Sequence, residues 1–355
     1  MSDWYKLEKA KVPYSVLSFL MDEFSEVNDI FKKDKLFFKR EYKMKDEIID
    51  KIFYAENLNI SQELEEIKKQ NIRLWTKNSE EYPRLLRNIE KPPLFLFVKG
   101  NMEIDEKTIG VVGTRKMTSY GKSATERITK ELVDCGVTIV SGLALGVDVT
   151  AHTKTLQNNG KTIAIVGSGL DVIYPSENRK IWEKIEQNGL LISEYPLGTP
   201  PNAWNFPRRN RIIVGLSRGV VVMESYKKGG SLITAKLAFS ENRDLFAIPG
   251  FISYPSFEGC NELIKSNTAK LITKADDILE EFGWDKFDNN NGKINIELGK
   301  EESQIYKRLI TEKNLDELIM ETRMKGTELL IRLTEMEIKG YIKSVPGGRY
   351  RRNEI

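Results

Sequence analysis

The sequence predicts an α/β protein with a Rossmann-like parallel sheet and helices on both faces. A small N-terminal helical domain and a C-terminal winged-helix domain are expected to flank it. Three observations support this fold class. Between positions 107 and 250, short apolar runs rich in β-branched residues alternate with amphipathic stretches of helical length, as in a parallel sheet buried on both faces. No glycine precedes Gly100, which favours helices joined by polar turns. Three helical stretches and a hairpin end the chain.

The first 70 residues are the expected N-terminal helical domain. Helices are predicted at Val12–Phe24, Met44–Ala55 and Ser61–Gln70, where apolar residues recur with helical spacing. Small helical domains of this shape often contact DNA through a helix–hairpin–helix, but that motif needs a glycine in its hairpin, and this segment has none. The sequence therefore favours a module that packs against the rest of the protein or contacts another protein.

The predicted α/β domain spans residues 71–286. Two strands, Ile72–Trp75 and Pro92–Gly100, lead into it. Six further apolar runs, each too short for a buried helix, are its expected parallel strands: 108–113, 137–142, 162–167, 190–194, 219–224 and 245–250. Ligands of such sheets bind beyond the carboxyl ends of the strands, so the glycine-rich loops at those ends are the expected site.

A polar linker, residues 287–299, is expected before a last domain, residues 300–355. Three helices and a hairpin are predicted in that domain: Ser303–Ile310, Asn314–Glu321, Lys325–Lys339, and Tyr341–Arg352 with its turn at Pro346–Gly348. This order is typical of a winged helix, with the third helix in the recognition position. Because that helix carries acidic and basic residues together, contact with a duplex and docking of a protein remain equally open.

Composition excludes several classes of function. The 355 residues include one histidine and two cysteines, too few for a multi-histidine metal site or a disulfide framework. The sequence therefore predicts no metal and no cofactor. It shows no signal peptide and no apolar run as long as a membrane span, so a cytoplasmic protein without membrane contact is expected. His152 follows Asp148 by four positions, on one helix face, and a structural or hydrogen-bonding role is expected for it.

The net charge of +3 is too small for a uniformly basic protein that wraps nucleic acid. Positive charge is instead concentrated in patches, above all in Phe206–Arg218, which holds four arginines and no acidic residue. Forked arginine contacts are suited to phosphate.

The first three loops at strand ends are candidate anion sites. The first has Gly113, Arg115 and Lys116 before a helix that Ser119 could cap, and a helix start attracts anions. It matches neither the dinucleotide fingerprint nor the P-loop. In the second loop, Gly142 and Gly146 allow close backbone approach to a ligand. In the third loop, Gly167 and Gly169 flank Ser168, whose hydroxyl and backbone could cradle a phosphate.

The fourth and fifth loops add arginines and a further helix start. The fourth gathers guanidinium groups, amides and a ring that could stack on bases: Asn205, Phe206, Arg208, Arg209, Asn210 and Arg211. The fifth opens a helix after a strand with Gly229, Gly230 and Ser231. Five such loops point to a ligand that bears phosphate. Four carboxylates could act as acids or bases (Asp148, Asp171, Glu194 and Glu224), but no activated nucleophile and no catalytic constellation is evident.

Five segments carry a family resemblance: SGLALGVD at 141–148, GSGLDVIYP at 167–175, SEYPLGTPP at 193–201, NFPRRNRII at 205–213 and GGSLITA at 229–235. In this order they resemble the DNA-processing protein A family (DprA, also called Smf). The resemblance runs from about Tyr82 to Trp284.

The resemblance implies a protein that binds single-stranded DNA cooperatively and forms a homodimer through its α/β domain. It also implies loading of the RecA recombinase onto incoming strands during natural transformation, past single-strand-binding protein, without catalysis. Carried over by position, the DNA pocket would use Arg115, the 167–169 loop and the arginines of 208–211. Many relatives have a basic residue after Tyr174-Pro175, where this chain has Ser176; Arg179 or Lys180 could replace it.

Two other functions remain open. Gly229–Ser231 at a helix start also resembles phosphoribohydrolases of a related Rossmann-like group, with Glu224 or Asp148 as the acid, so a nucleotide-cleaving enzyme is the main alternative. A nucleotide sensor that binds mononucleotides tightly and DNA weakly is the third possibility. Fold analogy does not separate the three.

Overall fold

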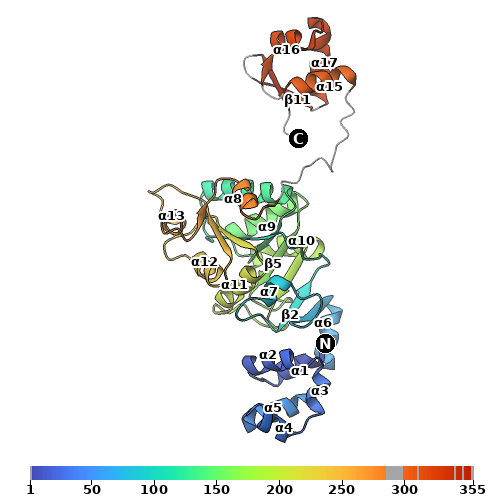
Figure 1. Cartoon of the computed structure of the whole chain (residues 1–355), viewed down its shortest axis with the longest axis vertical. Helices are drawn as coiled ribbons and strands as arrows, with labels where there is room; N and C mark the ends of the chain where they lie inside the picture. The colour runs from blue at the N-terminus through green and yellow to red at the C-terminus, as the bar shows by residue number, and fades with distance from the viewer. Residues whose placement is uncertain (1, 285–298, 310–311, 340, 346–347, 353–355) are drawn as a thin grey trace. The chain divides into compact units, whose positions relative to one another are not determined.

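The computed structural model describes residues 2–284, 299–309, 312–339, 341–345 and 348–352. The chain divides into two compact units, Met1–Phe287 and Asp288–Ile355, drawn in Figure 1. The predicted linker, residues 287–299, lies almost wholly outside the described residues.

The first unit is built on one nine-stranded sheet with the order β1-β2-β6-β5-β4-β3-β7-β8-β9. All pairs from β6 to β9 are parallel, whereas β2 pairs antiparallel with both β1 and β6. The strands are β1 Ile72–Thr76, β2 Phe95–Lys99, β3 Thr108–Val112, β4 Thr138–Ser141, β5 Thr162–Val166, β6 Leu190–Ser193, β7 Gly219–Val222, β8 Asp244–Ala247 and β9 Lys270–Leu271. The mostly parallel sheet and its six main predicted strands are confirmed. The two lead-in strands form its antiparallel edge.

The strand order reverses at β3. From β3 the chain moves outward through β4, β5 and β6, then returns to place β7 on the other side of β3. Right-handed crossovers in opposite directions put their helices on opposite faces of the sheet. Helices α8, α9 and α10, which follow β3, β4 and β5, pack side by side, and so do α11 and α12 on either side of β7 in the chain. Figure 1 shows both groups around the strands. Their bounds are α8 Ser119–Asp134, α9 Val147–Gln157, α10 Arg179–Asn188, α11 Asn205–Gly215, α12 Ser231–Ser240 and α13 Glu258–Lys265.

The parallel strands are buried on both faces because the helices cover both. Every residue of β3, β4, β5, β6 and β7 is buried. This explains why their sequences show continuous apolar runs rather than an alternating pattern.

The N-terminal helices pack on the β2 side of the sheet. Tyr5 lies edge-on to Phe95 and Phe97, with ring centroids 5.5 and 5.9 Å away, and the Tyr14 hydroxyl donates to the Pro92 carbonyl (2.9 Å). The helices here are α1 Ser2–Lys9, α2 Tyr14–Glu23, α3 Val27–Phe31, α4 Lys35–Glu41, α5 Asp46–Glu56 and α6 Ser61–Lys69. Packing against the sheet is what the glycine-free pattern favoured. The boundary at residue 70 stays a prediction.

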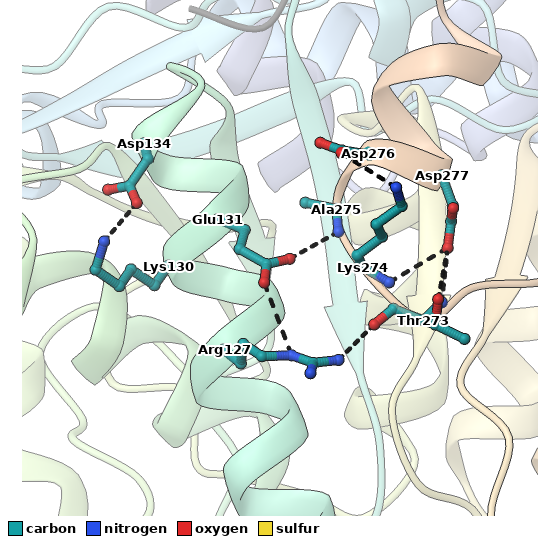
Figure 2. A network of polar contacts seen from close by, with 9 residues as sticks. All are labelled: Arg127, Lys130, Glu131, Asp134, Thr273, Lys274, Ala275, Asp276 and Asp277. Atoms are coloured by element: carbon teal, nitrogen blue, oxygen red, sulfur yellow. Dashed lines mark hydrogen bonds and ion pairs between the residues drawn. The ribbon is translucent and has the colours of Figure 1, made fainter. Parts of the chain in front are cut away.

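The last helix of the first unit, α14 (Asp276–Glu281), is tied to α8 by polar contacts. Figure 2 shows Arg127 and Glu131 of α8 reaching the segment before α14. The Arg127 guanidinium donates to the Thr273 carbonyl, and Glu131 accepts the Ala275 N–H at 2.9 Å. Asp277 accepts the Thr273 N–H at 2.7 Å. These contacts hold α14 where the unit ends.

The described residues of the second unit form three helices and a three-stranded antiparallel sheet of order β10-β12-β11. Its own apolar core includes Leu318, Leu333 and Ile342. The elements are α15 Lys300–Arg308, β10 Lys313–Asn314, α16 Leu315–Thr322, α17 Gly326–Ile338, β11 Ile342–Val345 and β12 Arg349–Arg352. The helices and the hairpin strands were predicted, whereas β10 was not. Residues 346 and 347 of the predicted turn lie outside the described residues.

Candidate functional site

The candidate site is a cavity of about 570 Å³ at the carboxyl edge of the sheet. It lies where the strand order reverses, as the general rule for open α/β sheets predicts. Residues from four of the five predicted loops line it: Gly113, Arg115, Phe206, Arg209, Asn210, Gly229, Gly230 and Ser231, together with Asp148 of the second loop. A smaller adjoining hollow is lined by Gly142 and Gly167, Arg115, Phe206 and Arg209. The structure thus brings all five loops together.

Loop one is fixed by Glu224 at the end of β7. The buried Glu224 carboxylate accepts the Thr118 N–H at 3.0 and 3.1 Å and the Thr118 hydroxyl at 3.1 Å. The Thr118 side chain in turn caps α8 by accepting the Gly121 N–H at 3.0 Å. The expected cap, Ser119, is wrong by one residue, because Thr118 has the extended backbone that a cap requires.

Arg209 is a buried clamp between loop two and strand β5. Only 4% of its surface is exposed, and its Nη1 donates to the carbonyl oxygens of Gly142 (2.6 Å) and Ile165. A Cβ on Gly142 would lie 2.6 Å from the guanidinium nitrogens, so glycine is needed for this close approach. Burial lowers the pKa of Arg209 to about 10. The Arg209 side chain therefore keeps its positive charge at neutral pH in the wall of the cavity.

Phe206 lies beside both arginines of the cavity. The Arg115 guanidinium lies 5.5 Å from the ring centroid and that of Arg209 lies 5.9 Å away, within range of cation–π attraction. Tyr174 lies 5.5 Å from Phe206 at a tilt of 40° and is 39% exposed. Arg115 is exposed, so the cavity offers a reachable cation beside two rings.

The three predicted arginines of α11 do not share one site. Successive helical positions are about 100° apart, so Arg209 faces the cavity with Phe206 and Asn210, while Arg208 and Arg211 lie on another face of α11. Arg211 pairs with Glu194 and donates to the Lys91 carbonyl at 2.8 Å. Arg208 is exposed outside the cavity lining. The expectation of a joint guanidinium cluster is therefore corrected to Arg209 with Arg115.

Loop three is a structural loop more than a hydroxyl cradle. The buried Ser168 hydroxyl donates to the Val172 carbonyl at 2.8 Å, and the Ser168 carbonyl accepts the Ser193 hydroxyl at 2.7 Å. Asn205 is buried and donates to the Gly167 carbonyl at 2.8 Å. Of the groups that were expected to hold phosphate, the Ser168 hydroxyl is therefore already used as a donor within the loop. This part of the prediction is corrected for the hydroxyl of Ser168.

Four further expected residues lie outside the lining of the cavity and its adjoining hollow: Lys116, Gly169, Asn205 and Arg179. Arg179 and Lys180 are exposed at the start of α10. Neither lines the cavity beside Tyr174, so neither supplies the missing basic charge there. Within the fifth loop, the Ser231 hydroxyl donates to the Ser225 hydroxyl at 2.8 Å, and this bond fixes the start of α12.

Asp148 is the titratable group of the cavity wall. Its carboxylate accepts the N–H groups of Gly142 (3.2 Å) and Ala144 (3.4 Å). Burial raises the pKa of Asp148 to about 6, although nearby Arg209 opposes the rise. One turn later, His152 is fully buried, its Nδ1 lies 2.7 Å from the Thr162 hydroxyl, and burial lowers its pKa to about 3. His152 is thus a neutral core residue, consistent with the structural role expected for it.

All four candidate acids already have partners. Glu224 holds the capping residue Thr118, Asp148 accepts two backbone N–H groups, Glu194 pairs with Arg211, and Asp171 accepts the Gly198 N–H at 2.8 Å. Among the residues that the structure describes, no group of three or more metal-binding side chains could hold an ion. The arrangement favours binding of an anionic ligand over chemistry upon it.

Two features of the site escaped sequence reasoning. Tyr174 was noted in its motif but not expected in the cavity, and Glu224 was weighed as an acid rather than as the partner that holds Thr118. Tyr174 lies far from Phe206 in sequence, and no local pattern signals their contact. The contact of Glu224 with Thr118 can be predicted only once it is known that β7 lies beside β3, because the two residues are far apart in the sequence.

No helix in the part of the chain that the structure describes is long and apolar enough to cross a membrane.

Comparison with known proteins identifies the region that holds the cavity. Residues 73–283 match the family model of DNA recombination-mediator protein A. The chain is 45% identical over 242 residues to protein Smf of Synechocystis, a match that covers 66% of this chain and 61% of that protein. It is 36% identical over 295 residues to protein Smf of Escherichia coli, covering 80% and 79% of the two chains, and 43% identical over 216 residues to DNA processing protein DprA of Bacillus subtilis, covering 60% and 72%.

Two solved structures share the fold. DNA processing protein A of Streptococcus pneumoniae superposes with a TM-score of 0.69 at 34% identity, covering 79% of this chain and 98% of that one. DNA processing protein A of Helicobacter pylori, whose single-stranded DNA binding mode was studied, gives a TM-score of 0.54 at 32% identity. That superposition covers 59% of this chain and 95% of the other.

Proposed function

This chain belongs to the DNA recombination-mediator protein A family, and from that premise we propose that it is a single-stranded DNA-binding recombination mediator. Its DNA site is the cavity beyond β3, β4 and β7. It loads the RecA recombinase onto incoming strands during natural transformation, past single-strand-binding protein, as a cytoplasmic homodimer joined through its α/β domain.

One observation carries the proposal: an exposed arginine, two rings and a buried cation meet in one cavity. Arg115 lies over Phe206, with Tyr174 beside the same ring and Arg209 beneath. Single-strand binders combine phosphate neutralisation with ring faces on which bases stack. The relative from Helicobacter pylori, studied for single-stranded DNA binding, supports the assignment.

The remaining expected contacts belong to the same proposal. The backbone of Gly113, Gly142 and Gly167 and the helix start at Gly229–Ser231 would approach phosphates, and exposed Lys116, Arg179 and Arg208 would meet the strand outside the cavity. No catalytic turnover is involved, which agrees with the bonded state of the four carboxylates.

The flanking regions have proposed roles as well. We infer that the large domain is Rossmann-like and that the 300–355 domain is a winged helix, since three helices precede the β11–β12 hairpin. The exposed side chains of α17 include Thr327, Leu330 and Ile331. These favour protein docking over duplex contact, because they cannot neutralise phosphate. The helical region 1–70 would serve as a packing module.

Nucleotide binding or cleavage is the competing function, and one observation favours it. Asp148 lines the cavity with a pKa raised to about 6, and a carboxyl group tuned in this way can act as a general acid. Its two backbone amide bonds count against it because they favour the ionised carboxylate, which cannot donate a proton.

Competition between ligands tests the proposal. A labelled oligothymidylate is titrated with the protein, with and without millimolar mononucleotides, and the nucleotides are then analysed for cleavage. We expect tight binding of the strand, no displacement and no cleavage. Displacement by a mononucleotide, or release of free base, would assign the cavity to a nucleotide. A strand-exchange assay with RecA and single-strand-binding protein then tests the loading step.

A further inference from the structure

A second cluster of rings is exposed next to the cavity, on the loop between β8 and α13 and on the elements beside it. We call it the aromatic flank; its members are Tyr120, Tyr226, Phe251, Ile252 and Tyr254. Their exposed fractions are 39%, 44%, 62%, 96% and 44%. Apolar groups gathered at this density on a surface mark a contact site more often than chance.

The flank is an ordered surface. Tyr120 donates its hydroxyl to the Pro249 carbonyl at 3.0 Å. The Phe251 ring lies 6.1 Å from Tyr120 and 5.4 Å from Tyr254, and buried Phe257 lies 5.3 Å from Tyr120. A hollow of about 230 Å³ opens between Tyr120, Pro249 and Phe251. The rings of Tyr120, Phe251 and Tyr254 are therefore held by packing, and each remains partly exposed to a flat ligand.

Two loops of the cavity lead directly into the flank. The Glu224 carbonyl accepts the Thr114 N–H at 2.8 Å in loop one, and its carboxylate holds Thr118, two residues before Tyr120. The fifth loop begins at Ser225–Tyr226, and the Ser225 carbonyl accepts the Gly259 N–H at 2.8 Å at the start of α13. The cavity and the flank thus share the end of β7 as a common support.

The charge beside the flank is mainly positive. Four exposed lysines lie on the same two loops and the first turn of α8: Lys116, Lys122, Lys227 and Lys228. Glu258 is exposed at the start of α13, and Lys122 is 3.9 Å from Glu126. Rings interleaved with lysines along a surface suit a single strand, whose bases stack while its phosphates meet the cations.

We propose that the aromatic flank is a second stacking subsite, which takes the next nucleotides of the single strand held in the cavity. The inference rests on the proposed function and adds a direction to it: the strand leaves the cavity past loop one and loop five, toward β8. Affinity then grows with strand length until the strand covers both subsites.

A length series tests the inference. The full chain and a Phe251→Ala/Tyr254→Ala variant are titrated with labelled oligothymidylates from about 4 to 20 nucleotides, a span that brackets the usual site size of such binders. We expect equal affinity for the shortest strand that binds and a loss of about ten-fold or more for long strands in the variant. Tyr54→Ala is the matched control, since Tyr54 is 61% exposed on α5, and it should bind every length as the wild type does.

A second measurement follows contact directly. In a Phe251→Trp variant, long strands should quench the indole fluorescence at 251 and the shortest should not, with the same titration of unsubstituted protein as the background. Equal affinity of the double variant at every length, or no quenching, would overturn the subsite.

Sedimentation of the wild type and the double variant without DNA tests whether the flank instead contacts a second copy of the chain. A change of oligomeric state in the double variant would assign the flank to a second copy of the chain and overturn the inference. Binding by the wild type that is lost in Arg115→Ala but untouched in the flank variant would leave the proposed function standing and refute the subsite alone. Failure of the wild type to bind any strand would refute both.

Discussion

At the residue scale, the site depends on side chains whose role is set by what surrounds them. Arg115 and Arg209 both contact Phe206, yet one is exposed and the other is buried against two carbonyl groups. The first is available to a phosphate, while the second ties loop two to strand β5. Sequence adjacency made all the arginines of 208–211 look equivalent, and only burial distinguishes them.

Gly142→Ala tests the clamp. The new methyl group would lie 2.6 Å from the Arg209 guanidinium, so one of them must move. We expect a loss of about 1–3 kcal/mol in the free energy of unfolding, as for other overpacked interiors, and weaker DNA binding. The measurement is urea denaturation. Gly230→Ala is the control, because open space surrounds that position, and it should leave stability nearly unchanged. Equal stability of the two variants would contradict the clamp.

Asp148→Asn tests the electrostatics of the wall. The folded-state pKa of Asp148 is raised from 3.8 to about 6, so its contribution to stability is fully present below about pH 4 and is lost as the pH rises through 6. The stability of the asparagine variant relative to the wild type should therefore improve between pH 4 and pH 7, by up to about 3 kcal/mol. Chemical denaturation at both pH values measures the change. A stability difference between the two proteins that does not change with pH would show that burial does not raise the pKa of Asp148.

At the element scale, the parallel strands were predictable and the connections between distant elements were not. In runs such as Thr162–Val166, every residue but Ala164 is β-branched, as expected for a strand buried by helices on both faces. The use of Glu224 to fix the start of α8 depends on β7 lying beside β3. The division of the α11 arginines between two faces of the helix depends on which face packs against the sheet. Neither fact is encoded within a short window of sequence.

The cap of α8 provides a test at this scale. Thr118→Ala removes both the cap of the Gly121 N–H and the hydroxyl bond to Glu224, and should cost about 1 kcal/mol or more of stability. Ser119→Ala is the matched control, since Ser119 is not the cap, and its unfolding should differ little from that of the wild type. The urea midpoints of the two variants show which residue caps α8. A larger loss of stability in the Ser119 variant would show that Ser119 is the cap.

At the scale of the whole molecule, the cavity belongs to one compact unit and the last domain to another. The first unit ends at Phe287, and the second has a core of its own. The domain boundaries stay predictions, which rest on changes of composition and of element pattern along the chain. The order of the strands in the sheet was not predictable, because strand neighbours far apart in sequence leave no local pattern.

Separate cores predict separable functions. A chain ending at residue 287 should fold with the melting temperature of the first transition of the full protein and bind single strands with the affinity of the full chain. Calorimetry and oligonucleotide titration measure the two quantities. A strong loss of affinity in the shortened chain would place part of the DNA site in the second unit.

The central claim, that the cavity holds phosphate through Arg115, is tested most directly by the salt dependence of binding. The logarithm of affinity for a labelled oligothymidylate is measured against the logarithm of salt concentration for the wild type, Arg115→Ala and Arg40→Ala, an exposed arginine of α4. Loss of one phosphate contact should weaken Arg115→Ala and make its slope shallower by about 0.7, while Arg40→Ala follows the wild type. An Arg115→Ala line that coincides with the wild type would contradict the claim.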